Sequence, residues 1–289
     1  MRKLSMMTIS MFFQMYFIFT INKDREELVE TYEEMMELIH DAGYEAVDIT
    51  SIEIQVLGLD KVKEILDNNG LQVSSFIHFD TYADMEISRF TEHIENGKRA
   101  VNITRALKCK TLMLVPQAQE SIEEYSGEQI RKQFISYWNP IVAYASLENI
   151  HCVVEDTPDL RLSFCTMDEM EKVLDGVPGL EVVYDSGNML LVDENPVEFY
   201  EKFAGKVKHI HLKDMRYAKK GEERADVAKN GRKMTVAPTG MGLVDLSEVL
   251  ASIKTHHYDG YLTVEFTPDD NGDYKKSLIR SKNFLQNLL

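Results

Sequence analysis

Short β-rich runs alternate with amphipathic helical segments along nearly the whole of this 289-residue sequence. The β-rich runs cover residues 4–13, 46–50, 73–79, 111–116, 151–157, 181–186, 207–214 and 260–266. The helical segments cover residues 25–40, 60–69, 84–107, 127–148, 167–174, 196–203, 246–254 and 274–289. Strands separated by helices run parallel, because the chain crosses back over the sheet before the next strand begins. Eight such pairs predict an α/β protein with one domain over residues 1–289, a closed (β/α)8 TIM barrel.

An open doubly wound sheet is the main alternative for such an alternation. The dinucleotide-binding form of that fold carries a G-x-G-x-x-G fingerprint directly after its first strand, and this sequence has none there. The sequence also has no Pro- or Ser-rich linker that would separate two domains. The closed barrel is therefore the expected architecture.

The first β-rich run belongs to an apolar stretch over residues 4–21, which follows Arg2 and Lys3. Such a stretch resembles a signal peptide or a membrane span. No small-x-small cleavage site follows it, and polar residues such as Thr8 and Gln14 interrupt it, which disfavours both interpretations. We therefore expect it to provide the first core strand, since the barrel needs eight.

Charge and cysteine content restrict the class of protein. The formal net charge of −16 disfavours a nucleic-acid partner, because such surfaces neutralise phosphates with Lys and Arg. Cys109, Cys152 and Cys165 include no C-x-x-C pair and are odd in number, so we expect reduced thiols in a cytoplasmic protein. No membrane partner is expected, and the sequence is compatible with a homo-oligomer.

The run at residues 207–214 has an unusual polar face. Successive side chains of a strand point to opposite faces, so His209, His211 and Lys213 share one face and Ile210 and Leu212 the other. The aliphatic face suits packing against helices, whereas the polar face suits a site inside the barrel. His209 lies one layer deeper than His211, and we expect it to support a ligand or fill the barrel.

Four consecutive runs end in a side chain that can bind a metal, at the strand ends where TIM barrels build their sites. These residues are Glu155, Asp185, His211 and Glu265. Three carboxylates brought together repel one another unless a cation neutralises them. Three oxygens and one imidazole suit Mn²⁺, Mg²⁺ or Co²⁺ better than a sulfur-rich structural zinc site would, and Zn²⁺ remains an alternative. We expect one divalent metal ion, with Mn²⁺ preferred.

These residues are part of a longer series: Glu155, Asp185-x-x-Asn188, His211-x-Lys213-Asp214, Gly240-x-Gly242-x-x-Asp245 and Glu265. Over nearly the whole chain, the series resembles the xylose-isomerase-like TIM barrels, a superfamily of sugar and sugar-phosphate isomerases and epimerases. The resemblance implies that Glu155, Asp185, His211 and Glu265 bind the metal, which holds adjacent oxygens of the substrate. It also implies that Glu155 and Glu265 are the acid/base pair that moves a proton beside a carbonyl.

Two features depart from the ketose 3-epimerases of that superfamily. Asn188 stands where they carry a histidine, and residues 157–161 lack their second glutamate. An amide can hydrogen-bond a hydroxyl group but cannot act as a base. The departures therefore count against a free-ketose 3-epimerase.

Four polar residues are expected to contact the substrate, namely Asn188, Arg216, His78 and Lys213. For His78, and for Asp48 on the second run, a purely structural role is the alternative.

Residues 215–242 form an extended connection after the seventh strand. Residues 215–236 carry seven basic and three acidic residues in an otherwise acidic chain. The connection is either a solvated loop or a lid that attracts an anionic or polyhydroxyl substrate.

The sequence therefore predicts a divalent-metal-dependent isomerase or epimerase of a small sugar or sugar derivative, which transfers a proton through a metal-stabilised enediolate. A lyase or dehydratase of the same fold, acting on a keto-sugar or an inosose, begins with the same proton abstraction, so both remain open. A DNA-repair enzyme resembling endonuclease IV is disfavoured by the acidic charge.

Overall fold

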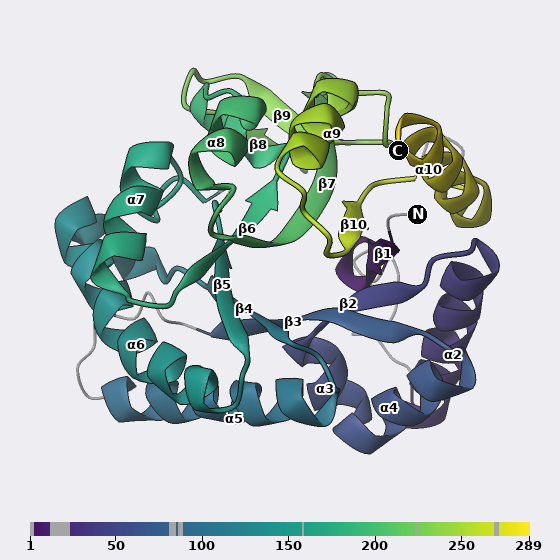
Figure 1. Cartoon of the computed structure of the whole chain (residues 1–289), viewed down its shortest axis with the longest axis horizontal. Coiled ribbons are helices and arrows are strands. Elements are labelled where there is room, and N and C mark those ends of the chain that lie inside the picture. The colour runs from purple at the N-terminus through teal and green to yellow at the C-terminus, as the bar shows by residue number, and fades with distance from the viewer. Residues whose placement is uncertain are drawn as a thin grey trace.

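The computed structural model describes residues 3–11, 24–80, 85, 89–157, 159–222, 225–268 and 272–289. Eight parallel strands form a closed barrel in this part of the chain (Figure 1). They are β1 (Leu4–Met7), β2 (Ala46–Thr50), β3 (Gln72–Asp80), β4 (Thr111–Pro116), β5 (His151–Glu155), β6 (Glu181–Asp185), β7 (Val207–Tyr217) and β10 (Leu262–Glu265). β10 closes the barrel by pairing with both β7 and β1. The predicted single-domain (β/α)8 TIM barrel is confirmed.

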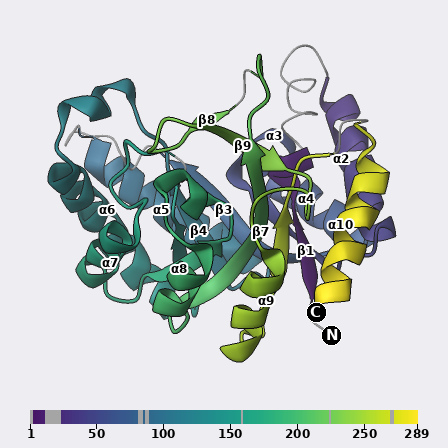
Figure 2. The same ribbon diagram turned by 90° about the horizontal axis from the view of Figure 1, so that it is seen from above.

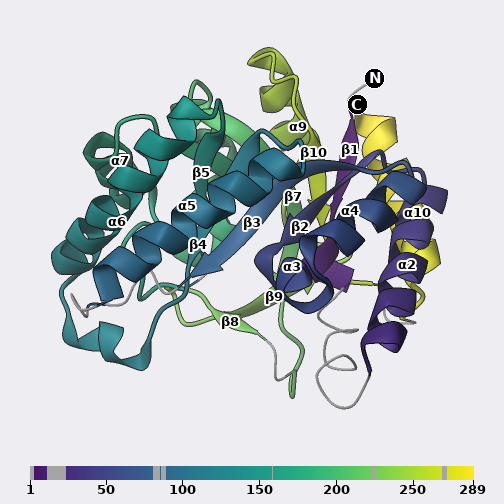
Figure 3. The ribbon, with the colours of Figure 1, turned by 90° about the horizontal axis from the view of Figure 1, so that it is seen from below.

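Helices cover the outside of the barrel, as two perpendicular views show (Figures 1 and 3). They are α2 (Arg25–Asp41), α3 (Ser51–Leu57), α4 (Leu59–Asn68), α5 (Phe90–Ala106), α6 (Gly127–Leu147), α7 (Met167–Gly176), α8 (Pro196–Phe203), α9 (Leu246–Thr255) and α10 (Tyr274–Leu288). Two 3-10 helices, η2 (Glu120–Glu124) and η3 (Asn188–Val192), lie in connections. Several starts are encoded locally: the Asp24 side chain accepts hydrogen bonds from the backbone of Glu26 and Glu27, and Pro196 occupies the first turn of α8.

The expected first core strand is present. β1 ends at Met7, and residues 8–11 are helical. The rest of the apolar stretch lies within residues 12–23, which are outside the described residues. Within the described parts of the chain, no helix is both long and apolar enough to cross a bilayer. All three cysteines are buried, and none of them is bonded to another.

Alternation along the strands separates the core from the site. Val154, Tyr184, Ile210 and Val264 are buried in the layer between barrel and helices. Their neighbours along each strand therefore point into the barrel. Apolar packing on their outer faces thus holds in place the strands whose ends carry the polar site residues.

The connection after β7 begins as a β-arm. β7 continues to Tyr217, where it pairs antiparallel with β9 (Lys233–Ala237), and β9 pairs with β8 (Asp226–Val227). Figure 2 shows this arm extending from the end of β7 beyond the barrel. Much of the expected loop is therefore hydrogen-bonded structure.

Asp214 fixes the return of this arm to the barrel. Its buried carboxylate accepts hydrogen bonds from the backbone nitrogens of Met215 (2.9 Å), Gly240 (3.1 Å), Gly242 (2.7 Å) and Val244 (3.1 Å). A Cβ atom at position 242 would lie 2.1 Å from Asp214 Oδ1, so only glycine fits there without movement. The Asp214 and Gly242 positions of the sequence series therefore shape the loop next to the site.

Replacing Asp214 by Ala is expected to destabilise the protein by about 2–4 kcal/mol, because several backbone N–H groups lose their acceptor. Urea unfolding followed by circular dichroism measures this free energy. Asp245→Ala is the matched control, since Asp245 caps α9 through two backbone nitrogens and its loss should cost about 1 kcal/mol. Equal costs for the two variants would contradict the anchoring role of Asp214.

Candidate metal centre at the barrel mouth

Four side chains from neighbouring strands converge inside the barrel. Glu155 ends β5, Asp185 ends β6, His211 lies on β7 and Glu265 ends β10. One ligand-type atom from each lies within 4.8 Å of the others. Asp185 is the strand partner of His211, which fixes their relative height in the barrel. The structure thus brings together the four residues that the sequence pattern indicated as candidate metal ligands.

The Asp185 carboxylate has one satisfied and one unsatisfied oxygen. Oδ1 accepts hydrogen bonds from the backbone nitrogens of Gly187 (2.7 Å) and Asn188 (2.8 Å). Oδ2 is buried and accepts no hydrogen bond within the described structure. Buried carboxylate oxygens rarely lack a partner. An oxygen held in this way, beside two further carboxylates and an imidazole, fits a hard divalent cation.

His211 is oriented by carboxylates on both sides of its ring. Its Nδ1 contacts Glu155, and its Nε2 lies 3.0 Å from Asp48 Oδ2. If Nε2 carries the proton that is donated to Asp48, the lone pair of Nδ1 faces the four-residue cluster. A carboxylate behind a histidine is a common support for a metal ligand.

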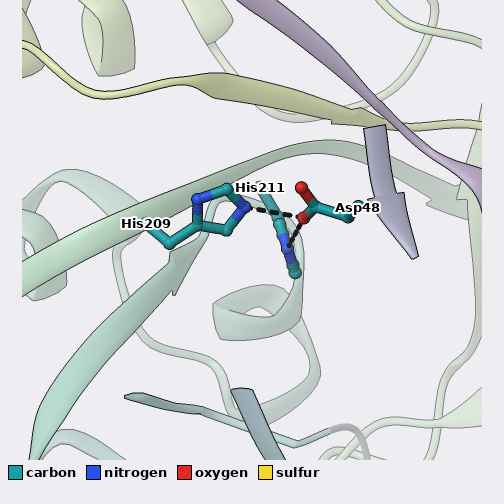
Figure 4. Close-up of side chains that lie close together, drawn as sticks. All are labelled: Asp48, His209 and His211. Atoms are coloured by element: carbon teal, nitrogen blue, oxygen red, sulfur yellow. Dashed lines mark hydrogen bonds and ion pairs between the residues drawn. The ribbon is translucent and has the colours of Figure 1, made fainter. Parts of the chain in front are cut away.

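Asp48 is completely buried and gathers donors from three strands. Oδ2 accepts from His209 Nε2 (2.6 Å) as well as from His211, and Figure 4 shows both rings directed at this carboxylate. Oδ1 accepts from Ser74 Oγ (2.5 Å) and Thr263 Oγ1 (3.2 Å). Asp48, His209 and His211 are themselves close enough to hold an ion. Because both oxygens of Asp48 already accept hydrogen bonds, we interpret Asp48 and His209 as the support of His211.

Replacing Asp48 by Ala is expected to weaken binding of a divalent metal by about 10–100-fold, because the ring of His211 loses its support. Isothermal titration with Mn²⁺ measures the dissociation constant. Ser74→Ala removes one donor but leaves both imidazole contacts, so its affinity should stay close to that of the unchanged protein. An unchanged affinity in Asp48→Ala would refute the supporting role.

Lys213 is the cation of the cluster. Its ammonium donates to Glu265 (2.7 Å) and to Asn188 Oδ1 (3.1 Å), and lies 3.8 Å from Asp185 Oδ2. Burial alone would lower the pKa of Lys213, but Asp185, Glu265 and Glu155 outweigh it and raise the pKa. Burial, reinforced by the neighbouring glutamates, raises the pKa of Asp185 to about 7. Burial would also raise the pKa of Glu265, yet Lys213 and other nearby groups lower it.

The four residues expected to contact the substrate lie in three different places. Lys213 and Asn188 lie in the cluster, where Asn188 also donates to the backbone oxygen of Asp156 at 2.7 Å. Arg216 lies on the arm and forms two hydrogen bonds to Glu222, at 2.7 and 2.9 Å. His78 lines a separate cavity beside α3 and α5.

A one-residue register shift in β3 explains the position of His78. β3 slips against β2 between Val47 and Asp48. The shift reverses the faces of the following residues, because side chains alternate along a strand. Ile77 therefore points into the barrel and His78 points towards the helices.

Asp156 is a buried acid that the sequence pattern did not predict as a site residue. Neither side-chain oxygen accepts a hydrogen bond within the described structure. Burial, Asp185 and Glu155 raise its pKa well above the ordinary value. Its position directly after Glu155 is the only sequence feature that points to it. That feature is weak, because adjacent residues of a strand usually face opposite sides.

A cavity of about 260 Å³ opens beside the cluster. Glu155, Thr157, Lys213 and Glu265 line one side of it, and apolar residues of β1, β3 and β4 line the other. Two carboxylates of the cluster therefore face a space that a small molecule can enter.

Comparisons with known proteins agree with this architecture. A family model described as "Xylose isomerase-like TIM barrel" matches residues 36–288. An inosose dehydratase from Clostridium perfringens is 30% identical over 109 residues, or 36% of this chain and 37% of that protein. The match thus spans little more than a third of this relative.

Solved structures that share the fold at low sequence identity include the following two. The IOLI protein with a bound zinc atom has a TM-score of 0.71 and 17% identity, with 99% of this chain and 97% of that chain covered. A D-allulose 3-epimerase from Methylomonas sp., in complex with D-allulose, has a TM-score of 0.70 and 14% identity, with 100% and 98% covered.

Proposed function

The chain belongs to the xylose isomerase-like TIM-barrel family, and on this basis we propose that it is a divalent-metal-dependent isomerase or epimerase of a small sugar or sugar derivative. The observation that carries the proposal is the convergence of Glu155, Asp185, His211 and Glu265 within 4.8 Å beside a cavity. A divalent ion held there, Mn²⁺ in our proposal, would act as a Lewis acid on substrate oxygens that gain negative charge. The zinc atom in the IOLI protein supports a divalent ion in this fold.

The protein groups that move the proton are proposed to be Glu155 and Glu265. Both line the cavity and they approach it from different strands, β5 and β10. One carboxylate can remove a proton from a carbon beside a carbonyl, and the other can return one. Lys213 keeps Glu265 ionised and therefore able to accept a proton.

Dehydration is the second candidate, favoured by the similarity to inosose dehydratases. It would begin with the same proton abstraction. The Lys213 ammonium also lines the cavity and could protonate a departing hydroxyl group. The arm of β8 and β9 is proposed as a lid in either case, with a basic composition that suits a polar substrate.

A deuterium-exchange screen tests the proposal. Ketoses, keto-acids and inososes are incubated in D₂O with the metal-loaded protein, and mass spectrometry detects exchange of a C–H, a change of isomer, or loss of water. We expect exchange that disappears with EDTA and returns with metal. Exchange that survives complete metal removal would contradict the proposal, and loss of water would identify a dehydratase.

Replacing Lys213 by Met is expected to separate metal binding from turnover. Removal of a cation 2.7 Å from Glu265 should tighten Mn²⁺ binding by about tenfold or more, since the carboxylates lose an internal competitor. Turnover at saturating metal should fall, because Glu265 then loses its ion pair. Titration calorimetry and steady-state kinetics check the two effects. Weaker metal binding in Lys213→Met would refute this role.

A further inference from the structure

The cavity at the barrel mouth has two chemically different walls. Its polar residues, as far as the structure describes the lining, are Glu155, Thr157, Lys213 and Glu265, on the side of β5, β7 and β10. The opposite wall is made by β1, β3 and β4. Its side chains include Met7, Ile77, Phe79, Met113, Val115 and Pro116.

The apolar wall is built into the barrel. Met7, Ile77 and Met113 pack with Val153 and Val183 in one buried cluster inside the barrel. Phe79 and Val115 are partly buried and rest on this cluster. Packing therefore fixes the wall. Turning these side chains away from the cavity would expose the buried cluster beneath them.

A ligand with hydroxyl groups on every carbon fits such a wall poorly. Hydroxyl groups turned towards Phe79 or Val115 would lose water without gaining a hydrogen-bond partner from these side chains, which weakens binding. Methylene or methyl groups in the same place gain free energy from burial. The two walls thus favour a molecule with one polar and one apolar half.

We propose that the substrate is a hydroxyketone whose carbons remote from the reacting end carry hydrogen or alkyl groups instead of hydroxyl groups. The inference rests on the proposed function, because it places the reacting hydroxyketone end against Glu155, Lys213 and Glu265. The remote carbons then lie against β1, β3 and β4.

Matched pairs of ketones test the inference. Erythrulose is compared with 1-hydroxy-2-butanone, and ribulose with 1-hydroxy-2-pentanone, so that the reacting end and the chain length stay the same within a pair. Binding to the metal-loaded protein is measured by titration calorimetry, and C–H exchange in D₂O by mass spectrometry. The alkyl member of each pair should bind and exchange about tenfold better or more.

Two nearly isosteric substitutions place a hydroxyl group on the wall. Phe79→Tyr and Val115→Thr should each reduce the preference for the alkyl ketone several-fold. Val73→Thr is the matched control for Val115→Thr. Val73 lies on the outer side of β3, where it packs against the helix layer, so this substitution should leave the preference unchanged.

The outcomes separate the two proposals. Preference for erythrulose and ribulose would overturn the inference while leaving the proposed function intact. Preferential binding of the alkyl ketones without exchange would support the inference and count against the proposed function. The inference is also overturned if no ketone of either pair binds. It is overturned as well if Phe79→Tyr and Val115→Thr lower the melting temperature without changing the preference, because the wall would then pack against the protein chain itself.

Discussion

Replacing Glu155 by Gln, and separately Glu265 by Gln, is expected to lower turnover by about 10²–10⁴-fold at saturating metal. Each substitution keeps the size of the side chain and removes its capacity to take up a proton. Both carboxylates line the same cavity, and each is proposed to act on its own side of the substrate. Initial rates of C–H exchange in D₂O, measured over a range of metal concentrations, separate lost chemistry from weakened metal binding.

Glu181→Gln is the matched control for these variants. Glu181 begins β6, where it contacts His151 at the start of β5, at the opposite end of the barrel strands. Its replacement should leave the rate unchanged. Near-normal activity in Glu155→Gln or Glu265→Gln would show that other groups transfer the proton.

Replacing Asp185 by Asn is expected to weaken divalent metal binding by more than about 100-fold. The amide oxygen can still accept the hydrogen bonds from Gly187 and Asn188 that hold this side chain. The amide nitrogen then replaces Oδ2, the buried oxygen to which no group in the described residues donates a hydrogen bond. This nitrogen neither carries charge nor binds a cation well. The Mn²⁺ dissociation constant, measured by titration calorimetry, checks this expectation.

Asp156→Asn is a sharp control because Asp156 is equally buried and lies outside the set of four. Neither of its side-chain oxygens accepts a hydrogen bond within the described structure, so the amide should fit. Its metal affinity should remain within a few-fold of the unchanged protein. Equal losses in Asp185→Asn and Asp156→Asn would mean that general buried charge, rather than ligation, governs affinity.

The fold and the four-residue cluster could be predicted because both depend on regular patterns. Parallel strands bring their carboxyl ends to one rim, and period-two alternation sends Ile210 and Leu212 outward and His211 inward. Strand ends alone were therefore enough to select Glu155, Asp185 and Glu265.

Features that depend on local irregularity could not be read from the sequence in the same way. The register shift in β3 reverses the faces of Ile77 and His78, and it follows from pairing with β2 rather than from local composition. α3 is a single short helix after β2, capped by Thr50 and Glu53, and too short for a periodic signal. The pairing of β7 with β9 joins residues separated by a basic loop.

The support of His211 was only partly predictable. The position of His209 one layer below His211 indicated a supporting residue, and its contact with Asp48 agrees with that role. The convergence of Ser74, Thr263 and both histidines on Asp48 requires four strands, β2, β3, β7 and β10, to meet inside the barrel. Such a meeting depends on the stagger of the whole barrel.

The location of a bound metal is the most direct test of the proposed metal site. A crystal grown with Mn²⁺ and measured near the manganese absorption edge shows the ion as an anomalous difference peak. We expect one strong peak about 2.0–2.6 Å from oxygens of Glu155, Asp185 and Glu265 and from a nitrogen of His211. A peak at another site, or none in this cluster at saturating Mn²⁺, would contradict it.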